Sequence, residues 1–254
     1  MIELANICRN YGKKVAVDEL SLSTETGEIF AFLGPNGAGK TTTIKMMVGL
    51  LRPNSGKIKI GGIDVADKPR ETNRLVGYVP DQPYLYDKLT GREFLQFVGE
   101  MRGMPSGDLK ESIEKQIAIF DLETFVDHLS ESYSHGMKQR VVFASALLHR
   151  PRVLIVDEPM VGLDPRSIRK VKDLFRREAA DGTTIFMSTH TLAVAEEIAD
   201  RIGVIDHGRL CFFGTVEKLR HETESLDSTL EELFLDLTQD ADSGVQSRES
   251  RVQS

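Results

Sequence analysis

The sequence lacks any apolar run that approaches the roughly 20 residues of a membrane-spanning helix. Its first residues, Met1 to Asn6, also lack the charged start and the apolar core of a secretory signal. These two absences argue against an integral membrane protein and against a secreted one. We therefore expect a cytoplasmic protein, whose role at a membrane would have to come through a partner.

Basic residues are outnumbered by acidic ones, and cysteines are scarce. The chain has 32 Lys and Arg against 39 Asp and Glu, a formal net charge of −7, whereas proteins that bind nucleic acids usually present a basic surface. We expect no nucleic-acid partner. Cys8 and Cys211 are far apart in sequence and have no metal-site spacing, which predicts reduced structural thiols. The remaining composition, 40% hydrophobic and 28% charged, is ordinary for a globular protein with a full core.

One segment does carry a strong chemical signal. An apolar run at residues 29–33 predicts a buried strand, and residues 43–48 predict a helix. The residues between them have the pattern of a phosphate-binding loop. This loop consists of Gly34, Pro35, Asn36, Gly37, Ala38, Gly39, Lys40, Thr41 and Thr42.

Each residue type in this loop suits a nucleotide. Glycines allow the backbone to curl until its N–H groups point at phosphate oxygens, and the following helix start adds its positive dipole end. Lys40 is a cation for the β- and γ-phosphates, and Thr41 offers a hydroxyl to Mg²⁺. The sequence therefore predicts nucleotide binding here.

A second signal follows the apolar run at residues 153–156. That run predicts a central parallel strand, and it ends in Asp157 and Glu158. A strand-end aspartate is where phosphate-loop ATPases hold Mg²⁺, and the adjacent glutamate could activate a water molecule. Upstream, Ser134 is a candidate N-cap for an apolar helix whose start, near Gly136, would form an anion site.

The pattern along the chain indicates an α/β fold. A small antiparallel β-layer comes first, with Tyr11 in its turn, and strand signals are replaced by helical spacing between Leu89 and Leu129. Residues 1–218 are predicted as one domain with a helical insertion at about 89–135. Residues 219–254 are predicted as an acidic tail with one amphipathic helix, Leu226 to Leu237, and a disordered end from Ser243. The other expected strands cover residues 2–7, 15–22, 57–60, 76–79, 184–188, 201–205 and 210–213, and the other expected helices cover 166–179 and 192–198.

Together these segments resemble the ATP-binding subunit of an ABC transporter. The resemblance covers roughly residues 1–218 and keeps the family's motifs in order. The matching segments are Gly34 to Thr42 for Walker A, Val153 to Glu158 for Walker B, Tyr133 to Gln139 for the L-S-G-G-Q signature, Gln82 for the Q-loop, Gly162 to Asp164 for the D-loop, His190 for the switch histidine and Tyr11 for the adenine-stacking aromatic.

The resemblance implies a fold and a set of roles. The fold is the phosphate-loop ATPase core with an N-terminal antiparallel β-layer and a helical insertion. Ser134 and Gly136 would hold the γ-phosphate bound to a second copy of the chain, in a head-to-tail dimer. His190 would also hold γ-phosphate, and Gln82 would sense Mg²⁺ or water and contact an integral membrane permease.

That contact leads us to expect a docking surface close to Gln82. Tyr84, Leu85 and Tyr86 follow it in the same loop, and exposed aromatic residues suit an interface.

The signature departs from the family pattern at three positions. Tyr133 stands for Leu, His135 for the first Gly and Met137 for Gln. This variant resembles subunits of ABC exporters, including those for drugs and natural products. An importer subunit stays as an alternative, as does a soluble ABC ATPase of translation or DNA repair. A phosphate-loop kinase or GTPase would not explain the signature helix.

Overall fold

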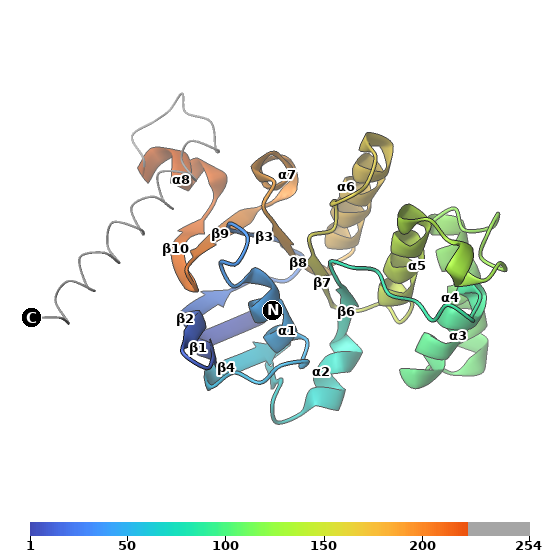
Figure 1. The fold of residues 1–254 in the computed structure, drawn as a ribbon, viewed down its shortest axis with the longest axis horizontal. Helices are drawn as coiled ribbons and strands as arrows, with labels where there is room; N and C mark the ends of the chain where they lie inside the picture. Colours follow the sequence, from blue (N-terminus) through green and yellow to red (C-terminus); the bar gives the residue numbers. More distant parts are fainter. Residues whose placement is uncertain (223–254) are drawn as a thin grey trace, which may run out of the picture.

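The computed structural model describes residues 1–222, which form two β-sheets and the helices that cover them (Figure 1). The predicted tail helix, Leu226 to Leu237, and the predicted disordered end lie outside the described residues. Within residues 1–222, no helix combines the length and the apolar character needed to cross a membrane.

The smaller sheet is the predicted N-terminal antiparallel layer. Its four strands lie in the order β2-β1-β4-β5, and all neighbouring pairs are antiparallel. The strands are β1 (Ile2–Tyr11), β2 (Lys14–Ser23), β4 (Ser55–Ile60) and β5 (Ile63–Asp64).

The larger sheet has six strands in the order β10-β9-β3-β8-β7-β6. The pairs from β9 to β6 are parallel, and β10 returns antiparallel to β9. β3, β7 and β8 are buried along their whole length, as expected for parallel strands covered on both faces. The strands are β3 (Ile29–Leu33), β6 (Val76–Val79), β7 (Val153–Asp157), β8 (Thr184–Thr189), β9 (Arg201–Asp206) and β10 (Arg209–Gly214).

Helix α1 (Lys40–Met47) lies between the two sheets (Figure 1). Alternate residues of β3 face opposite ways, so Phe30 and Phe32 pack with Ile44 of α1 and with the small sheet. Ala31 and Leu33 face the other side and pack with helices α5 (His135–Leu147), α6 (Pro165–Ala180) and α7 (Leu192–Ile198). The sheet is thus covered on both faces, which fixes the strand ends that carry the candidate site.

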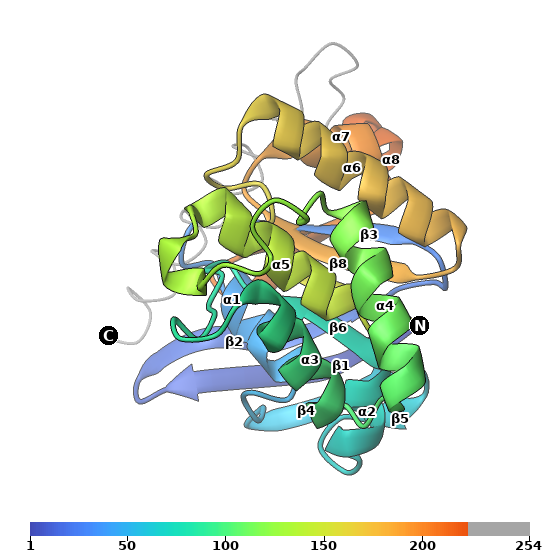
Figure 2. The same ribbon diagram turned by 90° about the vertical axis from the view of Figure 1, so that its right-hand side faces the viewer.

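The helical insertion lies between β6 and β7 and gathers to one side of the sheets (Figures 1 and 2). It contains α3 (Gly91–Met101), α4 (Ser106–Ile119), the short 3-10 helix η1 (Ser130–Ser132) and the start of α5. Its presence confirms the predicted fold class.

Two local predictions were wrong, and two short helices were missed. Residues 121–129 form turns rather than a helix, because Asp121 takes a left-handed conformation (φ 51°) just after α4. Tyr11 ends β1 rather than lying in the turn, since it pairs with Lys14. The sequence analysis also missed α2 (Pro69–Leu75) and the short α8 (Val216–Glu222).

Candidate functional site

The phosphate loop connects the buried end of β3 to the start of α1. A Cβ atom at Gly34 would lie 2.3 Å from the carbonyl oxygen of Ile205, and one at Gly39 would lie 2.5 Å from that of Ala16. Gly39 also has a φ of 114°, which residues with side chains rarely adopt. The loop is thus held tightly against neighbouring strands. The start of α1 has no side-chain cap, so its N–H groups are available to phosphate oxygens.

Lys40 is anchored inside this loop. Its side chain is only 6% exposed, and its Nζ atom donates to the carbonyl oxygens of Gly34 at 2.7 Å and Pro35 at 3.2 Å. The same Nζ atom lies 3.3 Å from Oε1 of Glu158. The loop lysine and the strand-end glutamate, which are far apart in sequence, therefore meet as an ion pair.

Glu158 is the central residue of this cluster. Its second carboxylate oxygen, Oε2, lies 3.0 Å from Nδ1 of His190, so the carboxylate sits between Lys40 and His190. Glu158 also has a φ of 50°, a conformation that is uncommon for a residue with a side chain. Its N–H donates to Oγ of Ser188 at 3.0 Å. Strained residues of this kind concentrate at functional sites.

Asp157 is fully buried beside Glu158. The Ser188 hydroxyl donates to its Oδ1 at 2.5 Å, whereas Oδ2 is buried without a hydrogen-bond partner among the described residues. Burial raises the pKa of Asp157, although the nearby hydroxyl groups of Ser188 and Thr41 act in the opposite direction. A buried carboxylate oxygen with a free lone pair beside a threonine hydroxyl fits a hard cation such as Mg²⁺.

The other predicted site residues occupy separate positions. Gln82 lies exposed in the loop between β6 and α3. Tyr11 is 49% exposed, and the guanidinium of Arg9 lies over its ring, 5.0 Å from the centroid. One face of that ring is thus already covered by a cation.

The signature residues are also separate from Lys40. Ser134 is the N-cap of α5 and accepts a hydrogen bond from the N–H of Met137 at 3.3 Å, and Gly136 lies in the first turn. Figure 1 shows α5 well to one side of α1. The structure brings together Lys40, Asp157, Glu158 and His190, but not the signature.

The expected docking loop needs one correction. Tyr84 is 72% exposed and Tyr86 is 47% exposed, as an interface requires, but Leu85 is only 2% exposed. Leu85 is buried in the core, where it packs with the hydrophobic cluster under the helical insertion.

Two polar residues near the site were missed by the sequence analysis. Ser188 pairs in register with Asp157 across the parallel strands β8 and β7 and hydrogen-bonds its carboxylate. Asp81, in the loop before Gln82, contributes its negative charge to the raised pKa of Asp157. Polar residues at the ends of neighbouring parallel strands are the signal that could have found Ser188.

The fold and the cluster at the strand ends together define a phosphate-loop ATPase. Residues 17–161 match the ABC transporter family. The chain is 38% identical over 215 residues to the linearmycin resistance ATP-binding protein of Bacillus subtilis (strain 168), covering 85% of this chain and 69% of that protein. It is also 38% identical over 219 residues to the daunorubicin/doxorubicin resistance ATP-binding protein of Streptomyces peucetius, covering 86% of this chain and 66% of that protein.

Solved structures agree with this match. An ATP-binding subunit of an ABC transporter superposes with a TM-score of 0.88 at 32% identity, covering 93% of this chain and 99% of that one. A dimeric ATP-binding cassette with ADP and phosphate superposes with a TM-score of 0.75 at 25% identity, covering 85% of this chain and 99% of that one. The chain belongs to the ABC transporter family, as an ATP-binding subunit that hydrolyses ATP to power transport.

Proposed function

We propose that this chain hydrolyses MgATP as one half of a head-to-tail dimer and so drives export through a separate membrane permease. The observation that carries the proposal is the position of Glu158, held between Lys40 and His190 at 3.3 Å and 3.0 Å. A carboxylate in this position can accept a proton from a water molecule that attacks the γ-phosphate. The reaction is ATP + H₂O to ADP + phosphate.

Binding of ATP would rearrange this cluster. The β- and γ-phosphate oxygens would take the place of Glu158 beside the ammonium group of Lys40, and the N–H groups at the start of α1 would bind the same phosphates. The freed carboxylate of Glu158 would then face the attacking water, with His190 next to it.

Thr41, Asp157 and Gln82 would hold Mg²⁺. The buried, unpartnered Oδ2 of Asp157 supports this role. The ion would neutralise charge that develops on the β- and γ-phosphates. Tyr11 would stack on the adenine, and its exposed ring supports such a contact.

Two protein partners complete the proposal. A second copy would contribute Ser134 and Gly136 to each ATP, since α5, which begins at the signature, lies to one side of α1 in its own chain (Figure 1). A permease would dock on Tyr84 and Tyr86, which would place the protein on the cytoplasmic face of the membrane. The resistance functions named for two relatives favour export of a drug or natural product over import.

The substitution Glu158→Gln tests the catalytic assignment. It removes the proton acceptor and keeps the shape, so the variant should bind MgATP while hydrolysing it at least about 100-fold more slowly. Because the bound γ-phosphate persists, an ATP-dependent dimer should accumulate in size-exclusion chromatography. An exposed glutamate on α7 provides the matched control, and Glu196→Gln should behave as the unsubstituted chain. Unimpaired turnover by a monomeric Glu158→Gln variant would contradict the proposal.

A further inference from the structure

Tyr133 stands immediately before Ser134, at a position where the family signature has leucine. Its side chain is buried, only 6% exposed, and its ring packs edge-on against Phe125 with the centroids 5.0 Å apart. A leucine could fill this space but could not supply the hydroxyl group. The contacts of that hydroxyl show what the tyrosine adds.

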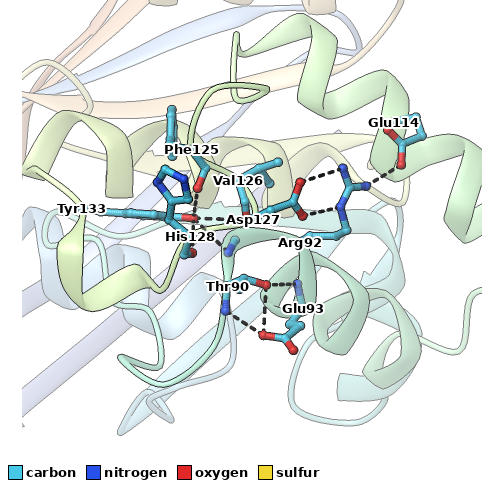
Figure 3. A network of polar contacts seen from close by, with 10 residues as sticks. Thr90, Arg92, Glu93, Glu114, Phe125, Val126, Asp127, His128 and Tyr133 are labelled. Atoms are coloured by element: carbon cyan, nitrogen blue, oxygen red, sulfur yellow. Dashed lines mark hydrogen bonds and ion pairs between the residues drawn. The ribbon is translucent and has the colours of Figure 1, made fainter.

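The hydroxyl oxygen joins two helix starts (Figure 3). It accepts a hydrogen bond at 3.0 Å from the N–H of Gly91, the first residue of α3. It also lies 2.8 Å from the carbonyl oxygen of Phe125 and 3.0 Å from that of His128, and its single proton is donated to one of them at a time. Burial raises the pKa of Tyr133, so the hydroxyl keeps its proton and can both accept and donate.

The start of α3 is fixed by several further contacts in the same network. Thr90 and Glu93 form a capping box, and the N–H of Arg92 donates to the carbonyl oxygen of Val126 at 3.0 Å. The Arg92 side chain pairs with Asp127 at 2.7 Å and also with Glu114 of α4 (Figure 3). Tyr133 therefore ties its own backbone, and Ser134 after it, to a unit that is already cross-linked by hydrogen bonds and ion pairs.

That unit also carries the exposed aromatic residues near Gln82. Phe94 and Phe97 of α3 lie 6.4 Å and 5.7 Å from the ring of Tyr86, which in turn contacts Tyr84. A partner bound to these aromatic rings would contact α3. The N–H of Gly91, at the start of α3, donates a hydrogen bond to the Tyr133 hydroxyl.

We infer that Tyr133 is a positioning residue, whose hydroxyl holds Ser134 in place for the γ-phosphate bound by the second copy. The inference rests on the proposed function, because Ser134 meets a γ-phosphate only in the shared site. Loss of the hydroxyl would leave the Gly91 N–H buried without its partner and free the segment that carries Ser134 to shift.

The substitution Tyr133→Phe, made in the Glu158→Gln background, tests this role. The phosphate loop is untouched, so binding of a fluorescent ATP analogue to the monomer should change by less than about twofold. The dissociation constant of the ATP-dependent dimer, measured by analytical ultracentrifugation, should rise about tenfold, which corresponds to about 1.4 kcal/mol.

A second substitution reaches the same hydrogen bond from the other side. A Cβ atom at Gly91 would lie 2.8 Å from the Tyr133 hydroxyl, so Gly91→Ala should displace it and weaken the dimer to a similar extent. If both act through this one contact, the double variant should be little worse than either single variant. Fully additive losses would count against the shared contact.

A general loss of stability needs a separate control. Ile113→Val in α4 removes a buried methyl group from the same helical insertion without touching the hydroxyl network. It should lower the melting temperature while leaving the dimer constant unchanged. Two results would overturn this inference while leaving the proposed function intact. One is an equal weakening of the dimer by Ile113→Val, and the other is an unchanged dimer constant in both Tyr133→Phe and Gly91→Ala. Failure of Glu158→Gln itself to dimerise with ATP would remove the proposed function and this inference together.

Discussion

At the scale of single residues, the most direct prediction concerns Lys40. Lys40→Ala removes the cation that contacts the loop carbonyls and Glu158, so ATPase activity should fall by at least about 100-fold. The fold should survive, since the loop's shape depends on glycine packing. Lys45→Ala, an exposed position on the same helix, is the matched control and should keep full activity. Activity near that of the unsubstituted protein in Lys40→Ala would remove this loop from the site.

For Asp157 we predict that one substitution raises stability and abolishes activity. Burial raises its pKa, so the folded chain holds the proton more tightly than the unfolded chain does. Ionisation therefore costs stability above the ordinary aspartate pKa of about 3.9, and the cost is complete once the pH exceeds the raised pKa. Asp157→Asn cannot ionise, so without nucleotide it should melt a few degrees higher at pH 7, with a difference that shrinks as the pH falls toward 4.

The same variant should lose Mg²⁺-dependent hydrolysis, because asparagine cannot offer a carboxylate to the ion. Thermal melts between pH 4 and 8 and an ATPase assay measure both effects. Asp173→Asn, at an exposed position on α6, controls for the change in net charge and should alter neither. A lower melting temperature for Asp157→Asn at pH 7 would show that burial does not dominate at this carboxyl group.

At this scale the sequence predicted the chemistry of the residues better than their contacts. The loop around Lys40 is contiguous, so its residue types alone predict phosphate binding. The pairing of Lys40 with Glu158, and of Asp157 with Ser188, depends on which parallel strands are neighbours and in what register. Neither contact is encoded in local spacing, so both needed the structure.

At the scale of elements, the loop between β6 and α3 is the surface to test. Tyr84 and Tyr86 are exposed, whereas Leu85 is buried, so we expect the two tyrosines alone to contact the permease. Tyr84→Glu combined with Tyr86→Glu should abolish co-purification with the permease, because carboxylates do not pack in an apolar interface. Val15→Glu places the same group at an exposed apolar position on β2 and should keep co-purification. Retention of the permease by the double variant would place the docking surface elsewhere.

Most elements were predicted where burial leaves a periodic or a continuous apolar pattern. The continuous apolar runs of β3 and β7 predicted covered strands, and both are fully buried. Helix α2 was missed because Thr72 is its only buried residue, so it shows no apolar stripe. The turns at residues 121–129 were mistaken for a helix since Leu122 and Phe125 are buried at helical spacing without being in a regular helix.

At the scale of the whole molecule, the fold class was predictable but the strand order was not. The order β10-β9-β3-β8-β7-β6 places β3 between β8 and β9, which are distant from it in the chain, and each parallel crossover passes through a helix. This order puts the ends of β3, β7 and β8 side by side, which assembles Lys40, Asp157 and His190. The signature helix α5 lies to one side of α1, beside α3 and α4 of the helical insertion (Figure 1).

That separation predicts that each active site is shared between two chains. Lys40→Ala and Ser134→Arg homodimers should both be inactive. The first lacks the cation that contacts the phosphates, and in the second the arginine side chain blocks the signature. Mixing them should restore one intact site per mixed dimer, with the phosphate loop from the Ser134→Arg chain and the signature from the Lys40→Ala chain. Partial recovery of ATPase activity on mixing, with heterodimers shown by differential tagging, supports the shared site.

A lack of recovery on mixing has two explanations. Heterodimers that stay inactive would mean either that each chain works alone or that both sites must be intact together. The dependence of unsubstituted activity on protein concentration separates these two explanations. A rise with the square of the concentration requires two chains and favours coupled sites, since closure on the γ-phosphate and its release by hydrolysis would then involve both sites at once. A linear rise at concentrations where the protein is monomeric would contradict sharing, because a lone chain would then complete its own site.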